Sequence, residues 1–187
     1  MAERARGVSR ATPSCPGVSA KFGATSATCP VDVTTTMDIR VANNPTTLDA
    51  ARALVRAHLA FHSVEPADIQ RVVDLLPSPY TPPTGELWVA YDGDDPLGCA
   101  AFQTIAADTA ELKRVFVRPE ARRRGVARAL MVHAIETIRD RGYARVRLGT
   151  QATAIGAQRL YEGLGFMRIE PYRKGDFGTV WFYELLV

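Results

Sequence analysis

The sequence predicts a mixed α/β fold, in which a twisted sheet of about seven strands is flanked by helices. Two apolar segments, 87–91 and 97–105, are joined by a short turn rich in Asp and Gly, which is typical of an antiparallel hairpin. β-Branched and aromatic residues at 115–117 then lead into helical periodicity over 126–138 and a further strand at 144–148. This order predicts a parallel βαβ crossover that follows an antiparallel N-terminal meander.

Before the hairpin, the chain divides into a polar tail and the start of a folded domain. Residues 1–37 are rich in Ser, Thr, Ala, Gly and Pro and lack periodicity, so we expect a disordered N-terminal tail. Met37 is interpreted as the start of the native protein, with the tail as an upstream extension of the reading frame. A single domain is expected over 38–187, and its first strand is expected at 39–42.

The remaining elements follow from local signals in the sequence. A stiff Pro-rich connection precedes the hairpin, and Gly165 ends a late helix. The expected order is a strand, two helices, three strands, a helix, a strand, a helix and two strands. The elements outside the hairpin and the crossover are helices at 46–63, from Pro66 onwards and at 154–164, and strands at 166–169 and 179–187 separated by a loop at 171–178.

Composition and charge restrict the function. The chain has 187 residues, of which 47% are hydrophobic and 23% charged, and this suits one globular domain. Its net charge of +3 is small for a general nucleic-acid binder, so no nucleic-acid partner is expected. A local basic cluster instead favours a small anionic ligand, and its members are Lys113, Arg114, Arg118, Arg122, Arg123, Arg124 and Arg128.

Hydropathy and cysteine spacing indicate the compartment. No apolar run approaches the ~20 residues of a membrane span, so no membrane partner is expected. Cys15, Cys29 and Cys99 show neither a disulfide framework nor zinc-ligand spacing. Cys99 lies in an apolar strand, where a small core residue is expected. These features predict a reduced, cytoplasmic protein.

The turn after the central strand has the features of a diphosphate site. The first N–H groups of a helix lack intrahelical partners and carry partial positive charge. Gly125 and the small Ala127 let a ligand approach the backbone, and Arg122, Arg123 and Arg124 add positive potential. The Walker and dinucleotide-binding glycine patterns are absent. Taken alone, the turn also fits a solvated basic cap on a core helix.

Two motifs in the correct order resemble the GNAT superfamily of N-acetyltransferases. The family's acetyl-CoA loop, Gln/Arg-x-x-Gly-x-Gly/Ala, is met by Arg122, Gly125 and Ala127. Downstream, the segment Tyr161-Glu-Gly-Leu-Gly-Phe166 resembles the family's Tyr-x-x-Leu-Gly-Phe. The resemblance covers nearly all of the expected domain, and it is greatest to small, stand-alone bacterial members with an unassigned acceptor. It implies the GNAT fold and acetyl-CoA as co-substrate.

The resemblance implies where acetyl-CoA is held. Backbone N–H groups near Phe116 and Val117 would face the acetyl carbonyl, at the point where the sheet splays. Ala154 stands where many relatives carry Asn, so that side-chain contact is not expected here. The implied contact residues are Val115, Phe116, Val117, Arg122, Arg123, Arg124, Gly125, Val126, Ala127, Arg128, Ala157 and Tyr161.

The resemblance also implies two catalytic residues. Tyr161 matches the family tyrosine that neutralises the departing thiolate, and two alanines on its helical face leave room for the co-substrate. The alternative is a core tyrosine with a satisfied hydroxyl. Glu111 opens the central strand, where several relatives place the glutamate that deprotonates the amine. The alternative is a solvated strand-end residue paired with Lys113 or Arg114.

An acceptor pocket is expected beside the early helices and the loop that follows them. By resemblance its wall is formed by Phe61, His62, Tyr80 and Tyr172, with Trp181 as a further candidate, and each of these residues could instead belong to the core. His58 and His62 lie one helical turn apart, but neither a third ligand nor a metalloprotease glutamate accompanies them. No metal site is therefore expected.

The expected function is transfer of the acetyl group of acetyl-CoA to a primary amine of a small molecule, by direct attack in a ternary complex. One alternative is a non-catalytic acyl-CoA-binding regulator. Another is an acetyltransferase that acts on a protein amine or an aminoacyl-tRNA. A nucleic-acid-associated protein would instead show steeply salt-dependent binding through its arginines. Formation of a homodimer is left open.

Overall fold

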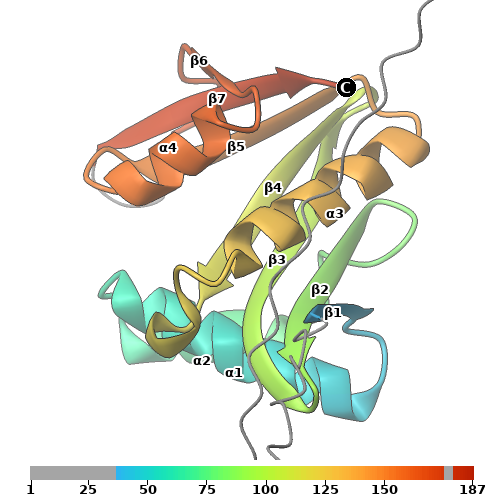
Figure 1. Ribbon diagram of the computed structural model, residues 1–187, viewed down its shortest axis with the longest axis vertical. Helices are drawn as coiled ribbons and strands as arrows, with labels where there is room; N and C mark the ends of the chain where they lie inside the picture. Colours follow the sequence, from blue (N-terminus) through green and yellow to red (C-terminus); the bar gives the residue numbers. More distant parts are fainter. Residues whose placement is uncertain (1–36, 175–178) are drawn as a thin grey trace, which may run out of the picture. The chain divides into compact units, whose positions relative to one another are not determined.

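The computed structural model describes residues 37–174 and 179–187 (Figure 1). Residues 1–36 of the expected tail and residues 175–178 of the expected loop lie outside the described part of the chain. Met37, which was expected to end the tail, is the first residue of a strand and pairs with Asp92. The first strand therefore begins before the predicted boundary of the folded domain.

The strands form one mixed sheet. They are β1 (Met37–Val41), β2 (Gly85–Asp92), β3 (Asp95–Ala106), β4 (Thr109–Val117), β5 (Arg145–Gln151), β6 (Met167–Ile169) and β7 (Val180–Leu186). Within the described residues, these seven strands lie in the order β1-β2-β3-β4-β5-β7-β6. Only the β4–β5 pair among them is parallel, and every other neighbouring pair is antiparallel. The predicted meander and parallel crossover are confirmed.

Helices cover both faces of the sheet. They are α1 (Pro45–Phe61), α2 (Pro66–Leu75), the short 3-10 helix η1 (Pro119–Ala121), α3 (Val126–Asp140) and α4 (Ile155–Glu162). Asn44 caps α1, because its side chain accepts a hydrogen bond from the Thr47 amide at 3.0 Å. Helices α1 and α2 pack on one face, and α3 packs on the other (Figure 1). Among the described helices, none combines the length and apolar character needed to cross a membrane.

Two apolar clusters fix these layers. One joins α1 and α2 to the sheet through side chains such as Leu54, Val55 and Val73. The other joins α3 to the opposite face through side chains such as Leu130 and Ile138. Strand β4 contributes to both clusters because successive residues of a strand point to opposite faces. The site is built on this central strand.

Strands β4 and β5 separate halfway along their length. They pair only from Thr109–Arg145 to Leu112–Leu148, so the following backbone edges diverge. The β3–β4 register also shifts between the pairs Ala101–Lys113 and Cys99–Phe116, which leaves two residues of β4 opposite one of β3. This bulge contains Arg114, whose φ of 57° lies in the left-handed region. The sheet thus opens beside a bulged strand.

Candidate active site

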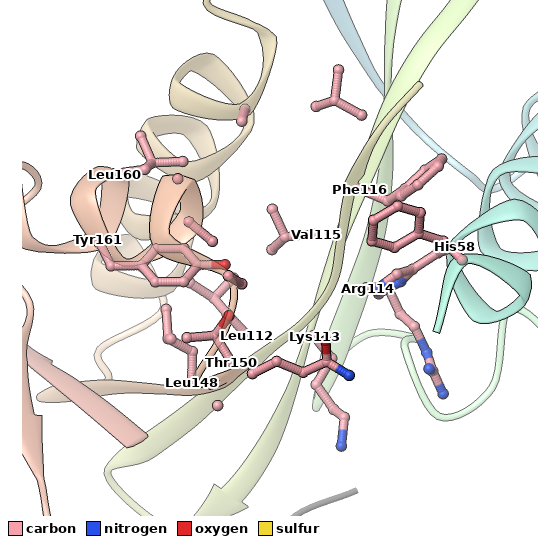
Figure 2. Close-up of a pocket in the computed structure, with 18 of the residues that line it drawn as sticks. His58, Leu112, Lys113, Arg114, Val115, Phe116, Leu148, Thr150, Leu160 and Tyr161 are labelled. Atoms are coloured by element: carbon pink, nitrogen blue, oxygen red, sulfur yellow. The ribbon is translucent and has the colours of Figure 1, made fainter. Parts of the chain in front are cut away.

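A cavity of about 650 Å³ occupies the opening between β4 and β5. Its walls come from β4, β5, the end of α1, the start of α3, and α4 (Figure 2). Figure 2 shows Tyr161 and Leu160 on one side of β4, and His58 and Arg114 on the other. The cavity therefore reaches both faces of the central strand, and each face has its own chemistry.

The start of α3 lines one part of the cavity. Gly125 is the N-cap of this helix, with a φ of 82°, and a left-handed backbone of this kind favours glycine. Arg123 also has a positive φ, of 64°. Arg122 donates a hydrogen bond from Nε to the Val117 carbonyl at 3.2 Å, and its guanidinium lies 5.3 Å from the Phe61 ring centroid. The implied diphosphate residues that line the cavity here are Arg122, Arg123, Gly125, Val126, Ala127 and Arg128.

Arg124 is the exception in this turn. Arg124 is not one of the described residues that line the cavity. Its guanidinium instead donates to the Asp92 carboxylate at 2.6 Å, at the end of β2. An arginine that faces away from a turn cannot be distinguished by sequence from one that faces into it. The implied contact of Arg124 with acetyl-CoA is therefore not supported by its position.

Helix α4 places Tyr161 against the cavity. It is 6% exposed and lines the cavity together with Ala157 and Leu160 of the same helix. Burial raises the pKa of the Tyr161 phenol to about 12, with the neighbouring Tyr183 as a smaller cause. The phenol therefore stays protonated at neutral pH and can act as a hydrogen-bond donor. Val115, Phe116 and Val117 of β4 also line the cavity.

Glu111 lies beneath the cavity instead of inside it. Its side chain is only 1% exposed, which contradicts the alternative of a solvated glutamate. Glu111 is also not one of the described residues that line the cavity. The carboxylate accepts hydrogen bonds from the Tyr172 hydroxyl at 2.7 Å and from Arg173 Nε at 2.6 Å. The expected pairing with Lys113 is also present, at 3.6 Å. Glu111 thus ties the base of β4 to the loop before β7.

The four candidates for the acceptor wall separate into two groups. Phe61 and His62 line the cavity. Tyr80 is 4% exposed, and its hydroxyl accepts a hydrogen bond from Arg114 Nε at 3.1 Å, so it supports a lining residue from behind. Tyr172 is engaged with Glu111 and with the Phe182 ring, at a centroid distance of 4.8 Å.

The ring of Trp181, the further candidate, contacts Arg168. The guanidinium of Arg168 is 3.7 Å from the Trp181 ring centroid. Tyr80, Tyr172 and Trp181 are not among the described residues that line the cavity. The structure therefore does not place these three residues at the cavity, and an aromatic residue on a loop or strand gives no sequence signal of the face that it occupies.

Several lining residues were missed by the sequence reasoning. Lys113 and Arg114 were expected as members of the basic cluster and as alternative partners of Glu111, but not as lining residues, and Arg173 was not singled out. Gln158 supports the cavity indirectly, because its buried amide donates to the backbone carbonyls of Gln151 and Ala152. Such roles depend on which strands and loops meet, and this is not encoded in local sequence.

Two histidines, His58 of α1 and His62 at its C-cap, face the cavity and are held neutral. Their ring centroids are 4.9 Å apart, and His58 stacks on Phe116 at 5.5 Å. Burial, and then the neighbouring His62 and Arg114, lower the pKa of His58 to about 3. Burial also lowers the pKa of His62, partly opposed by a hydrogen bond with the Gln151 side chain. Within the described residues, no cluster of three or more metal-ligating side chains occurs.

Together these features define a protein with a cavity between two diverging strands, bordered at the start of α3 by a glycine cap and several arginines. The chain belongs to the acetyltransferase (GNAT) family, whose sequence profile matches residues 52–166. The N-acetyltransferase C1271.07c of Schizosaccharomyces pombe is 33% identical over 146 residues, which are 75% of this chain and 89% of that protein. The N-acetyltransferase YsnE of Bacillus subtilis is 36% identical over 93 residues, which are 49% of this chain and 60% of that protein.

A third relative and two solved structures complete the comparison. The N-acetylaspartate synthetase of Danio rerio is 40% identical over 92 residues, which are 48% of this chain and 33% of that protein. An acetyltransferase structure from Streptococcus agalactiae has a TM-score of 0.67 at 23% identity, covering 81% of this chain and 98% of that one. A GNAT family acetyltransferase from Elizabethkingia anophelis, with acetyl-CoA bound, has a TM-score of 0.58 at 17% identity, covering 81% and 98%. These two structures share the fold.

Proposed function

We propose that the protein transfers the acetyl group of acetyl-CoA to a primary amine of a small molecule, by direct attack in a ternary complex. The observation that carries the proposal is the cavity itself, which runs from the positive start of α3, past Tyr161, to the two histidines at the end of α1. Support comes from the family, from the acetyl-CoA bound to the Elizabethkingia protein, and from a relative named for an N-acetylated amino acid.

Acetyl-CoA would bind along β4 with its diphosphate at the start of α3. The amide groups of the first helical turn, together with Arg122, Arg123 and Arg128, provide donors and positive charge there. Beyond the last β4–β5 pair, the diverging strand edges can hydrogen-bond an extended amide-containing arm as they would another strand. When bound, acetyl-CoA supplies an activated thioester.

The bulge on β4 would polarise the acetyl carbonyl. Backbone N–H groups of the segment 114–117 lie beside the cavity, and a bulge turns such groups out of the regular ladder. Donors fixed in advance stabilise the negative charge that develops on the carbonyl oxygen. The Cys99 thiol supports this geometry, since it donates to the Arg114 carbonyl at 3.2 Å.

Tyr161 would donate a hydrogen bond to the departing sulfur. A thiol has a pKa near ~8.5, well below the pKa of about 12 of this phenol, so full proton transfer from tyrosine is uphill. A charge-assisted hydrogen bond still stabilises the thiolate. The proton of the amine would pass to His62, which is neutral because burial lowers its pKa. Glu111, with its carboxylate already held by Tyr172 and Arg173, would act as a positioning residue.

Calorimetric titration of acetyl-CoA tests the binding half of the proposal. Gly125→Glu puts a bulky anion at the proposed diphosphate site and should abolish micromolar binding. Gly142→Glu is the matched control, because Gly142 has nearly the same φ, 84° against 82°, and follows the far end of α3. Equal binding by both variants would contradict a diphosphate site at this turn.

A panel of small amines with detection of released CoA tests the transfer half. Amine-dependent release by the wild-type protein is expected, and it should disappear in Gly125→Glu at the same acetyl-CoA concentration. Tight binding of acetyl-CoA without release in the presence of any amine would contradict transfer and favour the acyl-CoA-binding regulator.

A further inference from the structure

Four aromatic rings form a continuous row along one wall of the cavity. Phe116 of β4 stacks on His58 of α1, with their ring centroids 5.5 Å apart. His62 then meets the His58 ring at 4.9 Å, and Phe61 meets the His62 ring at 5.3 Å, both edge to face. We call these four residues the aromatic wall, and all of them line the cavity. Figure 2 shows Phe116 and His58 together on the side of β4 opposite Tyr161.

The aromatic wall carries no charge of its own, because both of its histidines are neutral. Burial is the largest cause of the lowered pKa of each ring, and the pKa of His58 is about 3. A neutral imidazole packs through its flat face and its edge as a small aromatic ring does, and the ring contacts here have that geometry. The wall is therefore one extended aromatic surface.

The end of the wall at Phe61 is open. Phe61 is 62% exposed although it lines the cavity, whereas Phe116 at the other end is 8% exposed. Single exposed apolar residues are ordinary on a protein surface, but Phe61 continues a row of rings. Its ring is also held between His62 and the guanidinium of Arg122, which lies 5.3 Å from the Phe61 centroid. An ordered apolar ring of this kind favours an apolar ligand, since little further entropy is lost when the ligand covers it.

We infer that the acceptor is an amine that carries an aromatic ring on a short alkyl arm. The inference deepens the proposed function and rests on it, because it treats the aromatic wall as part of the acceptor site. The ring of the acceptor would pack against Phe61, at the centroid distance of about 4.5–7 Å that aromatic pairs prefer. Its amine would then lie within reach of His62, which neighbours Phe61 in the wall and is the proposed proton acceptor.

Substrates that differ only in the side group test the inference. Phenethylamine is compared with 2-cyclohexylethylamine, which has the same arm and a saturated ring, and with n-butylamine, which has no ring. All three are primary alkylamines, so the reacting group is the same. The kcat/KM for phenethylamine should be at least about tenfold higher than for n-butylamine and about threefold higher than for 2-cyclohexylethylamine. An equal or higher kcat/KM for either comparison amine would overturn the inference.

Variants at an exposed position locate the effect. Phe61→Ala removes the open ring and should reduce the preference for phenethylamine over n-butylamine about fivefold, while Phe61→Tyr keeps a ring and should retain the preference. Leu75→Ala is the matched control. Leu75 is 63% exposed, ends α2 as Phe61 ends α1, and is not among the described residues that line the cavity. An unchanged preference in Phe61→Ala, or an equal loss in Leu75→Ala, would refute the aromatic wall as the acceptor site.

A binding measurement separates this inference from the proposed function. The three amines are titrated calorimetrically into the protein in the presence of CoA, so that no transfer is required. Tighter binding of phenethylamine, lost in Phe61→Ala, supports the aromatic wall even if no amine releases CoA from acetyl-CoA, a result that would contradict transfer alone. Equal binding of the three amines, or no binding of phenethylamine, overturns the inference and leaves the transfer activity to the release assay.

Discussion

At the scale of single residues, burial decides what each titratable group can do. Tyr161 was assigned from a motif and Glu111 from its place at the start of the central strand; both are buried, yet only Tyr161 is among the described residues that line the cavity. The Tyr-x-x-Leu-Gly-Phe motif specifies a helix followed by a strand, so the side-chain direction comes with it. Glu111 has no such local frame. Its partners, Tyr172 and Arg173, come from a loop more than 60 residues later in the chain. The periodicity of the sequence around Glu111 does not indicate such a distant contact.

Replacing Tyr161 tests its role as a donor to the thiolate. Tyr161→Phe removes the hydroxyl and should lower the single-turnover rate of acetyl transfer by about 10- to 100-fold, the value of one charge-assisted hydrogen bond. Binding of acetyl-CoA in calorimetry should change little. Tyr183→Phe is the control. The ring centroids of Tyr183 and Tyr161 are 6.1 Å apart, but Tyr183 is not among the described residues that line the cavity. Equal rates for the two variants would exclude the donor role.

His58 should make the stability of the protein depend on pH. In the folded state its pKa is about 3, and in the unfolded chain it returns to about 6.5. Below pH 6.5 the unfolded state therefore binds a proton that the folded state excludes, and stability falls as the pH drops towards 3. Between pH 7 and pH 5 this one group should cost about 2 kcal/mol of unfolding free energy.

Urea unfolding of wild-type protein and His58→Leu at both pH values isolates this contribution. Both proteins share the titration of their carboxylates, so the difference between their pH dependences belongs to His58. The variant should lose about 2 kcal/mol less than the wild type between pH 7 and pH 5. The buried Nδ1 of His58 indicates that the ring is excluded from water. The same loss of stability in both proteins would contradict this.

At the scale of elements, the sequence predicted most of the order and the types correctly. Hydrophobic periodicity and glycine signals were enough for the hairpin, for α3 and for the short helix α4, with ends that differ by a few residues. The bulge on β4 was not predicted, because it depends on register with β3. Register is set by cross-strand packing that a single sequence does not reveal.

Gly98 is the residue of β3 that lets the bulged strand come close. A Cβ at this position would lie 2.5 Å from the Phe116 carbonyl oxygen, so Gly98→Ala must displace β4. We expect a loss of about 1–3 kcal/mol in urea unfolding and weaker binding of acetyl-CoA, because the displaced segment borders the cavity. Gly156→Ala is the control for stability, since its Cβ would meet nothing within 4 Å. Unaltered stability of Gly98→Ala would show that the strand tolerates the shift.

At the scale of the whole domain, the site is a place where the sheet stops being continuous. Four parallel residue pairs connect β4 to β5, and beyond them the two halves of the sheet diverge around the cavity. The resemblance implied this splay correctly, because the fold is shared across the family. The part of the cavity lined by residues of α1, β4 and the loop before β7 could not be predicted, since these residues meet only in three dimensions.

Glu111 lies close to the point where β4 and β5 diverge. We expect its charge to contribute mainly to the stability of the fold and less to catalysis. Glu111→Gln keeps the shape of the side chain but leaves Arg173 and Lys113 without their shared anion. Removal of one partner from a buried ion pair should cost about 3 kcal/mol in urea unfolding. The rate of transfer should fall by a similar factor at every pH, because positioning is lost and no titrating group is removed.

A general base would be recognised by the pH dependence of the rate. If Glu111 took the proton, Glu111→Gln would also lose the acidic limb of the pH–rate profile. Glu184→Gln provides the matched control, because its carboxylate pairs with Arg147 at 2.7 Å but is 20% exposed, and it should cost less than about 1 kcal/mol. Since the Glu111 carboxylate is enclosed by a tyrosine and two cations at the root of the splay, we expect the stability loss to be the larger effect.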